Sequence, residues 1–461
     1  MKKHTLYLLI VPLLFSCKSY GEEENDLKVL HEPETTHIGQ HKFVTKPSPV
    51  KMPKPSFYEK IFPREKLPVT LSCSGYIKNE FWWDTYQIKD ARDDQFVFYP
   101  LQRTLDANCQ DINARGNYNM VPIQSRLRIE MHGPNIGNAK TFGCIEGDFF
   151  GRTDEPFLTD NMFRIRHAFT QIEYPDLKII AGQEWHPLFF PVESPDTIGF
   201  NTGVPIDPFS RSPQIRVTYY KKGWEVSGFM LGYTDVKSFG PNLVVGNPST
   251  IYARNSLTPE LYLELKYNLH DKHFFAIGGE MKRICPRLET NTGLRSVEVF
   301  TTKGAIAYLK LDLDPIDFYL KGIYLENAAD MLMIGGYAVK TTDPVTNVQT
   351  YAPMRTLAIW TEIVYRRSIE PAIFIGYAKD IGTHDRLVLN EGQPTTYGEG
   401  TNINHVFRIS PRIRWYYGPL TVGVELEFTR AAYGILNDHA KAEHTVATNN
   451  QRFHFACFYR F

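Results

Sequence analysis

The chain has 461 residues, a length that allows one large domain or two to three ordinary ones. It contains 51 Lys and Arg residues and 51 Asp and Glu residues, so its formal net charge is zero. A nucleic-acid-binding protein normally carries an excess of basic residues, and the charge balance therefore argues against that class.

Residues 1 to 21 are predicted to be a signal peptide. Lys2 and Lys3 precede an apolar run over residues 6 to 15, which is too short to cross a bilayer as a helix. Two processing sites remain open. Cys17 ends a lipobox-like sequence and would become a lipidated N-terminus, whereas ordinary cleavage would follow Gly21. Either route takes the mature chain out of the cytoplasm.

Residues 22 to 69 are predicted to form a linker. The segment is polar and at first acidic, and residues 46 to 68 contain six prolines. Proline at this density favours an extended, semi-rigid spacer over a packed domain.

From residue 70 onwards the sequence predicts β-strands. The last one shows the pattern most clearly, because Phe453, Phe455 and Tyr459 alternate with Arg452 and His454, as expected for a strand with one apolar face. The sixteen predicted strands cover residues 70–86, 121–132, 139–150, 162–174, 176–184, 212–221, 223–234, 258–268, 273–286, 296–313, 316–327, 354–366, 369–380, 402–416, 419–430 and 446–461.

Short and long connections alternate between these strands. The chain turns within a few residues after each even-numbered strand, whereas the loops after odd-numbered strands are longer and reach residues 88–120 and 185–211. This alternation is typical of an outer-membrane barrel with tight periplasmic turns and long outer loops. Backbone groups in hydrocarbon must pair internally, so such a sheet has to close. The sequence therefore predicts an all-β fold, a transmembrane antiparallel barrel of about 16 strands over residues 70–461, with the linker in the periplasm.

The alternation also assigns arginines to the inner wall. An Arg on the lipid face near the midplane would cost about 2 to 4 kcal/mol, so these side chains are predicted to face a wet lumen. The strands that carry them are neighbours in a closed barrel and would form one basic sector that guides anions. An inner wall in which the arginines merely pair with Glu130, Glu425 and Glu427 stays open as the alternative. The predicted pore-lining residues are Arg126, Arg128, Arg164, Arg166, Arg216, Arg408, Arg412, Arg414, Arg452 and Arg460.

The third long loop, residues 185 to 211, carries the acids Glu193, Asp196 and Asp207. We expect this loop to narrow the pore with its acids opposite the basic sector. Acids on one side of a narrow lumen and arginines on the other would set up a strong local field. Each Arg can make bidentate contacts to a carboxylate or a phosphate, which would favour anions.

Several short motifs resemble the DcaP-like trimeric porins. They are Gly75 to Lys78, Arg164 to Phe169, Ala181 to Trp185 and Arg211 to Arg216, and the resemblance covers about residues 70 to 461. It implies a sixteen-stranded trimeric channel in the outer membrane of a Gram-negative-type bacterium, a third outer loop that folds into the lumen, and a preference for small anionic solutes. The terminal Phe461 is similar to the aromatic signal that the outer-membrane assembly machinery reads. The proline-rich linker departs from relatives that have a heptad-like helix at this place.

No catalytic set, cofactor or metal site is predicted. The cysteines show no paired spacing, and neither His167 nor His454 has a second ligand at metal spacing. The expected partners are outer-membrane lipid, small solutes and two further copies of the chain. Two other classes stay open, namely an outer-membrane barrel enzyme of lipase or protease type and a plugged structural or adhesive surface protein.

Overall fold

The computed structural model describes residues 69–461 except 152–160, 191–193, 236, 242–247 and 271. The predicted signal peptide, Cys17, residues 22–68 of the linker and Glu193 lie outside the described residues. None of the described helices is long and apolar enough to span a membrane.

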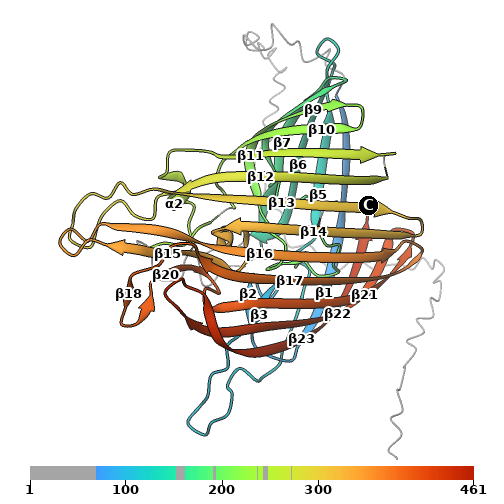
Figure 1. Cartoon of the computed structure of the whole chain (residues 1–461). Coiled ribbons are helices and arrows are strands. Elements are labelled where there is room, and N and C mark those ends of the chain that lie inside the picture. Colours follow the sequence, from blue (N-terminus) through green and yellow to red (C-terminus); the bar gives the residue numbers. More distant parts are fainter. Residues whose placement is uncertain (1–68, 152–160, 191–193, 236, 242–247, 271) are drawn as a thin grey trace, which may run out of the picture. The chain divides into compact units, whose positions relative to one another are not determined.

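Sixteen strand positions form one closed antiparallel wall, and each strand pairs with the next along the chain (Figure 1). β4 and β5 both pair with β1 and share one position, interrupted at residues 122–125. The wall strands are β1 (Thr70–Asp84), β4 (Asn117–Val121), β5 (Arg126–His132), β6 (Lys140–Gly151), β7 (Met162–Glu173), β8 (Leu177–Trp185), β9 (Arg211–Lys221), β10 (Trp224–Leu231), β11 (Glu260–Leu269), β12 (His273–Ile284), β13 (Phe300–Asp312), β14 (Ile316–Glu326), β16 (Gln349–Tyr365), β17 (Ile369–Thr383), β21 (Ile403–Tyr417), β22 (Leu420–Leu436) and β23 (Ala442–Arg460). The predicted sixteen-stranded barrel is thereby confirmed.

Further elements that the sequence analysis did not predict lie in the long connections. β15 pairs with β16 and β20, which extends the sheet beyond the wall, and β2 pairs with β3 in the first long loop. They are β2 (Ile88–Ala91), β3 (Phe96–Pro100), β15 (Gly335–Thr342), β18 (Leu389–Asn390), β19 (Gln393–Pro394), β20 (Thr396–Glu399), the helix α2 (Ile251–Arg254) and the 3₁₀-helix η3 (Ala328–Met331).

The last strand closes the wall by pairing with the first. The register runs from Tyr76 opposite Arg460 to Asp84 opposite Arg452. The two faces of β23 also follow the predicted period of two, because Phe453 and Phe455 are 40% and 37% exposed whereas Arg452 is 3% exposed. The apolar face therefore points outwards and the polar face inwards.

Two long loops pack inside the wall. One cluster of buried apolar side chains combines Phe96 and Phe98 of loop 1 (residues 85–116), Phe200 and Ile206 of loop 3 (residues 186–210), and wall residues such as Trp360. The Phe96 and Phe200 rings lie 4.9 Å apart in an edge-to-face arrangement. At this level loops 1 and 3 thus form a packed apolar cluster with the wall, whereas the sequence predicted that loop 3 alone narrows a wet lumen.

Candidate functional site

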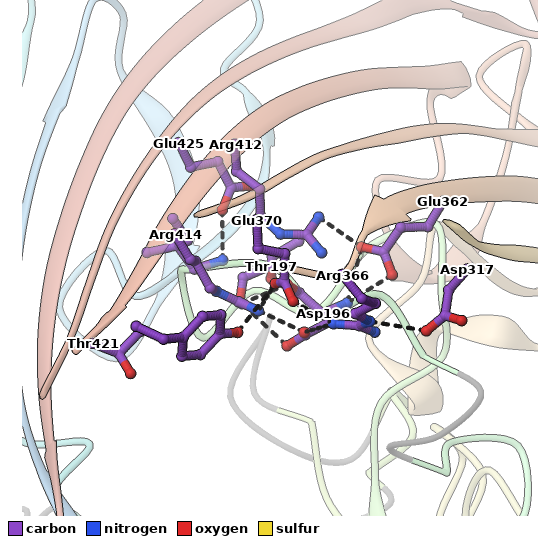
Figure 2. Close-up of polar contacts among 12 residues, drawn as sticks. Asp196, Thr197, Asp317, Glu362, Arg366, Glu370, Arg412, Arg414, Thr421 and Glu425 are labelled. Atoms are coloured by element: carbon purple, nitrogen blue, oxygen red, sulfur yellow. Dashed lines mark hydrogen bonds and ion pairs between the residues drawn. The ribbon is translucent and has the colours of Figure 1, made fainter. Parts of the chain in front are cut away.

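Loop 3 contacts the inner wall through backbone and side-chain groups (Figure 2). Arg414 of β21 donates hydrogen bonds of 2.5 and 3.1 Å to the two carboxylate oxygens of Asp196. The Ile198 amide donates to Glu425 of β22 at 2.6 Å, and the Asp196 amide donates to Glu362 of β16 at 3.1 Å. Three wall strands remote from loop 3 in sequence hold its central part, so the loop lies against the inner wall.

The C-terminal part of loop 3 is attached to the wall by a second set of contacts. Asp207 is fully buried and forms an ion pair of 2.8 Å with Lys321 of β14. The same carboxylate accepts a hydrogen bond of 2.8 Å from the Trp360 indole of β16. Asp196 and Asp207 were predicted to lie opposite the basic sector. Asp196, which is partly exposed, pairs with Arg414 of that sector, whereas the buried Asp207 pairs with Lys321 outside it, because a buried carboxylate requires a partner.

Several of the ten predicted pore-lining arginines face inwards but are covered. Arg166, Arg408, Arg412 and Arg452 are between 1% and 4% exposed, because carboxylates and the inward loops surround them. The shortest ion pairs join Arg166 to Glu146 at 2.8 Å and to Asp148 at 2.9 Å, Arg412 to Glu362 at 2.7 Å, and Arg452 to Asp84 at 2.6 Å. These four side chains are therefore enclosed in ion pairs inside the barrel rather than open to a wet lumen.

The other predicted arginines are less enclosed or differ in their partners. Arg128 pairs with Glu130 at 2.7 Å and Arg164 with Asp148 at 2.8 Å, and both remain about 30% exposed at the side chain. Arg216 of β9 lies 5.5 Å from the centre of the Phe190 ring and 5.6 Å from that of Phe229.

A cavity of about 330 Å³ lies between loop 3 and the wall. Its lining includes five cations and the single acid Asp196, which Arg414 already engages. Arg126 and Arg460 lie directly opposite Tyr76 on the two strands that flank it. The cations of the lining are Lys78, Arg126, Arg166, Arg414 and Arg460.

The cations of the cavity lining differ in how closely carboxylates pair with them, and Lys78, for example, pairs with Glu80 at 2.6 Å. Glu146 is within 3.4 Å of Arg126 and also pairs with Arg128 and Arg166. Arg460 donates to the Thr421 hydroxyl, lies 5.3 Å from the Phe458 ring, and has no carboxylate partner within the described residues. Arg126 and Arg460 are thus the guanidinium groups best placed to meet an anion.

The ion pair between Asp196 and Arg414, which tethers loop 3 to the wall, depends on pH. The Asp196 side chain is 48% exposed to the cavity, yet its position inside the barrel favours the protonated carboxyl. The Arg414 guanidinium outweighs that effect and holds the pKa of Asp196 below its usual range. A depressed folded-state pKa makes the tether complete above the unfolded-chain value of about 3.9 and weak only as the pH falls through the lower folded value.

We therefore expect the ion pair between Asp196 and Arg414 to be unchanged between pH 5 and pH 8 and to weaken only at a pH below the ordinary carboxyl range. Conductance measured at pH 3, 5 and 7 checks this expectation when wild type is compared with Asp196→Asn, which lacks the titrating group. A difference between the two proteins that changes between pH 5 and pH 7 would contradict the assignment.

The structure also brings together a buried cluster that sequence spacing did not reveal. His186, Glu260 and Glu280 place one possible ligand atom each within 4.8 Å of one another, although they are far apart in the chain. The Leu188 amide donates to Nδ1 of His186, which leaves the proton on Nε2, 2.9 Å from Glu260. Burial lowers the pKa of His186 to about 4. This arrangement fits a neutral imidazole that donates a hydrogen bond better than it fits a metal ligand, whose Nδ1 normally donates.

Comparisons with known proteins rest on structure alone. The sequence matches no protein-family model and no curated protein. The outer membrane channel DcaP of Acinetobacter baumannii superposes with a TM-score of 0.61 at 15% identity, over 85% of this chain and 97% of that chain. OmpT of Vibrio cholerae, an outer membrane protein in a trimer form, gives a TM-score of 0.50 at 12% identity, over 85% of this chain and 99% of that chain. The chain therefore has a DcaP-like porin fold.

Proposed function

We propose that this protein is an outer-membrane channel for small hydrophilic solutes, with a preference for small anions such as carboxylates. The observation that carries the proposal is the cavity beside loop 3, where Arg126 and Arg460 flank Tyr76 inside a closed sixteen-stranded wall. An Arg guanidinium offers paired donors that match a carboxylate, and low-dielectric walls strengthen its field. No catalytic set is part of the proposal.

The barrel fold also suggests which partners the protein binds. We propose that the chain assembles as a homotrimer in the outer membrane, supported by its fold similarity to a protein with a trimer form. The exposed terminal Phe461 is proposed as the contact for the outer-membrane assembly machinery.

Ion selectivity in planar bilayers tests the anion preference. In a KCl gradient, the reversal potential of the wild type is expected to show chloride preference. Replacing Arg126 and Arg460 by Gln is expected to lower the chloride to potassium permeability ratio. A unit charge about 6 Å from an ion in water contributes about 0.7 kcal/mol, so the expected loss is roughly threefold per residue.

Arg283→Gln together with Lys303→Gln is the matched control, because both side chains are exposed on the outward faces of β12 and β13 and the double variant removes the same charge. Cation preference of the wild type would overturn the anion proposal. An unchanged ratio in the Arg126 and Arg460 variant would show that these residues lie off the permeation path.

A plugged surface protein is the second candidate. The apolar cluster that joins loops 1 and 3 to the wall favours it, since such packing narrows the interior. The absence of any conductance from folded wild-type protein would support this candidate and remove the channel proposal.

A further inference from the structure

Three basic side chains gather on the outward face of neighbouring strands. Lys379 of β17, His405 of β21 and Arg430 of β22 are exposed or half-buried, whereas their chain neighbours Ala378 and Val406 are fully buried. Lys379 lies directly opposite His405. Arg430 lies opposite the residue two positions after His405, on the same face. The three strands lie side by side in Figure 1.

All three side chains lie at one height on the wall. Lys379 and Arg430 are each ten residues from the first residue of β17 and β22, at the end with the short turns. His405 is ten residues from Trp415 on β21. Ten residues of a strand tilted by about 40° rise about 26 Å, which matches an apolar belt about 25 Å tall. The basic group therefore lies at the outer rim of the belt, on the side of the long loops.

No carboxylate neutralises this group within the described part of the chain. None of the three residues forms an ion pair there, and the His405 ring instead stacks on Tyr377 with 5.4 Å between ring centres. Lys379 and Arg430 are therefore cations that no carboxylate of the described residues neutralises. An anion from outside the chain would neutralise these two cations.

An apolar hollow begins beside the basic group. It has a volume of about 1070 Å³ and its lining extends over the outer faces of β10 to β17, including Lys379 itself. Small residues create it, because Gly279 lies opposite Ala305 and Ala307 lies opposite Gly322 on adjacent strands.

The strand register connects the hollow with the basic group. One row of directly opposed outward residues runs from Gly279 through Ala305, Tyr324 and Leu357 to Lys379 and His405. The next row runs from Ala307 through Gly322, Ile359, Tyr377 and Phe407 to Arg430. A ligand that spans both features needs an anionic head at one end and apolar chains at the other.

We propose that Lys379, His405 and Arg430 bind the phosphate of a phosphorylated glycolipid in the outer leaflet, whose acyl chains occupy the hollow over Gly279, Ala305, Ala307 and Gly322. The inference rests on the proposed outer-membrane location, because only that location brings such a lipid to the rim on the side of the long loops. Basic clusters at membrane interfaces recognise anionic head groups by the same electrostatic attraction.

Native mass spectrometry of the full-length protein in detergent tests the proposal. The protein is titrated with bis-phosphorylated lipid A, with dephosphorylated lipid A, and with inorganic phosphate. The wild type is expected to bind the bis-phosphorylated lipid at least tenfold more tightly than the dephosphorylated one. Lys379→Gln together with Arg430→Gln is expected to abolish that preference and to leave binding of the dephosphorylated lipid unchanged.

Two further variants separate the head-group site from the hollow. Gly322→Leu is expected to weaken the binding of both lipids by the same factor. A side chain at Gly322 meets no atom within 4 Å and would project into the hollow. Lys221→Gln together with Arg367→Gln removes two exposed charges at the opposite end of the barrel. This double variant is expected to bind both lipids with the affinities of the wild type.

Equal affinity of the wild type for the two lipids would overturn the proposal, as would an unchanged preference in the Lys379 and Arg430 variant. Displacement of the lipid by an equal concentration of inorganic phosphate would also overturn it, by showing a site for free anions. The result does not depend on conductance, so a protein that binds lipid but does not conduct would defeat the channel proposal and leave this one standing.

Discussion

Replacing Arg408 by Met is expected to raise the single-channel conductance several-fold and to add large fluctuations to the current. Arg408 holds both inward loops to the wall, because it donates to the Val97 carbonyl of loop 1 at 2.7 Å and to the Val204 carbonyl of loop 3. It also donates to Thr429 at 2.8 Å. Methionine fills a similar space but donates no hydrogen bond, so both loops lose this shared attachment.

The size of the effect follows from the burial of Arg408, which is 1% exposed and lies 3.3 Å from Glu427. Removing one partner of a buried ion pair costs about 3 to 5 kcal/mol. That ion pair joins two wall strands, whereas the loops are held by the two hydrogen bonds that Arg408 donates to their carbonyls, each about 1.5 to 3 kcal/mol for a charged donor. A change of about 3 kcal/mol shifts the equilibrium of loop attachment more than a hundredfold.

Single-channel recordings in planar bilayers measure both quantities. Arg386→Met is the control, because its ion pair with Asp438 lies at the surface and the Arg386 side chain is 80% exposed. The same conductance and current noise in Arg408→Met and wild type would mean that loops 1 and 3 do not limit the current.

Replacing Asp84 by Ala is expected to give the largest loss of stability. Asp84 is fully buried and accepts hydrogen bonds from Nε and Nη2 of Arg452 at 3.0 and 2.6 Å. It accepts a third, of 2.6 Å, from Asn450. Alanine leaves the Arg452 charge buried without its partner, at a cost of about 3 to 5 kcal/mol.

Unfolding in urea, followed by the electrophoretic shift between folded and unfolded protein, measures the loss. The double variant Asp84→Ala with Arg452→Met is expected to be more stable than Asp84→Ala alone, because no unpaired charge remains. Asp438→Ala removes an exposed pair and is expected to cost less than about 1 kcal/mol. If Asp84→Ala unfolds with the same midpoint as Asp438→Ala, the pair does not stabilise the closure of the wall.

The strands of the wall were predictable from sequence because each carries its own signal. An inward residue such as Arg452 and an outward residue such as Phe453 alternate along the strand, and the tight turns separate consecutive strands. The β2 and β3 hairpin was missed although the run Phe96, Val97, Phe98, Tyr99 is continuously apolar. Such a run indicates a strand buried on both faces, and all four residues are indeed buried.

The pairing of the site residues was not predictable. Asp84 and Arg452 are 368 residues apart, and Asp196 and Arg414 are 218 residues apart. No local pattern connects such positions, since their contact depends on the closure of the barrel and on the path of loop 3. The sequence assigned the arginines to the inner wall by the cost of charge in lipid, but that argument says nothing about which carboxylates cover them.

The seam between β1 and β23 also constrains how the protein matures. Its pairs join residues from the two ends of the barrel sequence, so the wall cannot close until the whole chain has been delivered to its membrane. Contacts of such sequence separation form late and slowly. A chain that lacks its final strand would leave β1 and β22 with unpaired edges, which promote aggregation and proteolysis. The closure of the wall therefore distinguishes complete from incomplete chains, because only a complete chain pairs the edges of both β1 and β22.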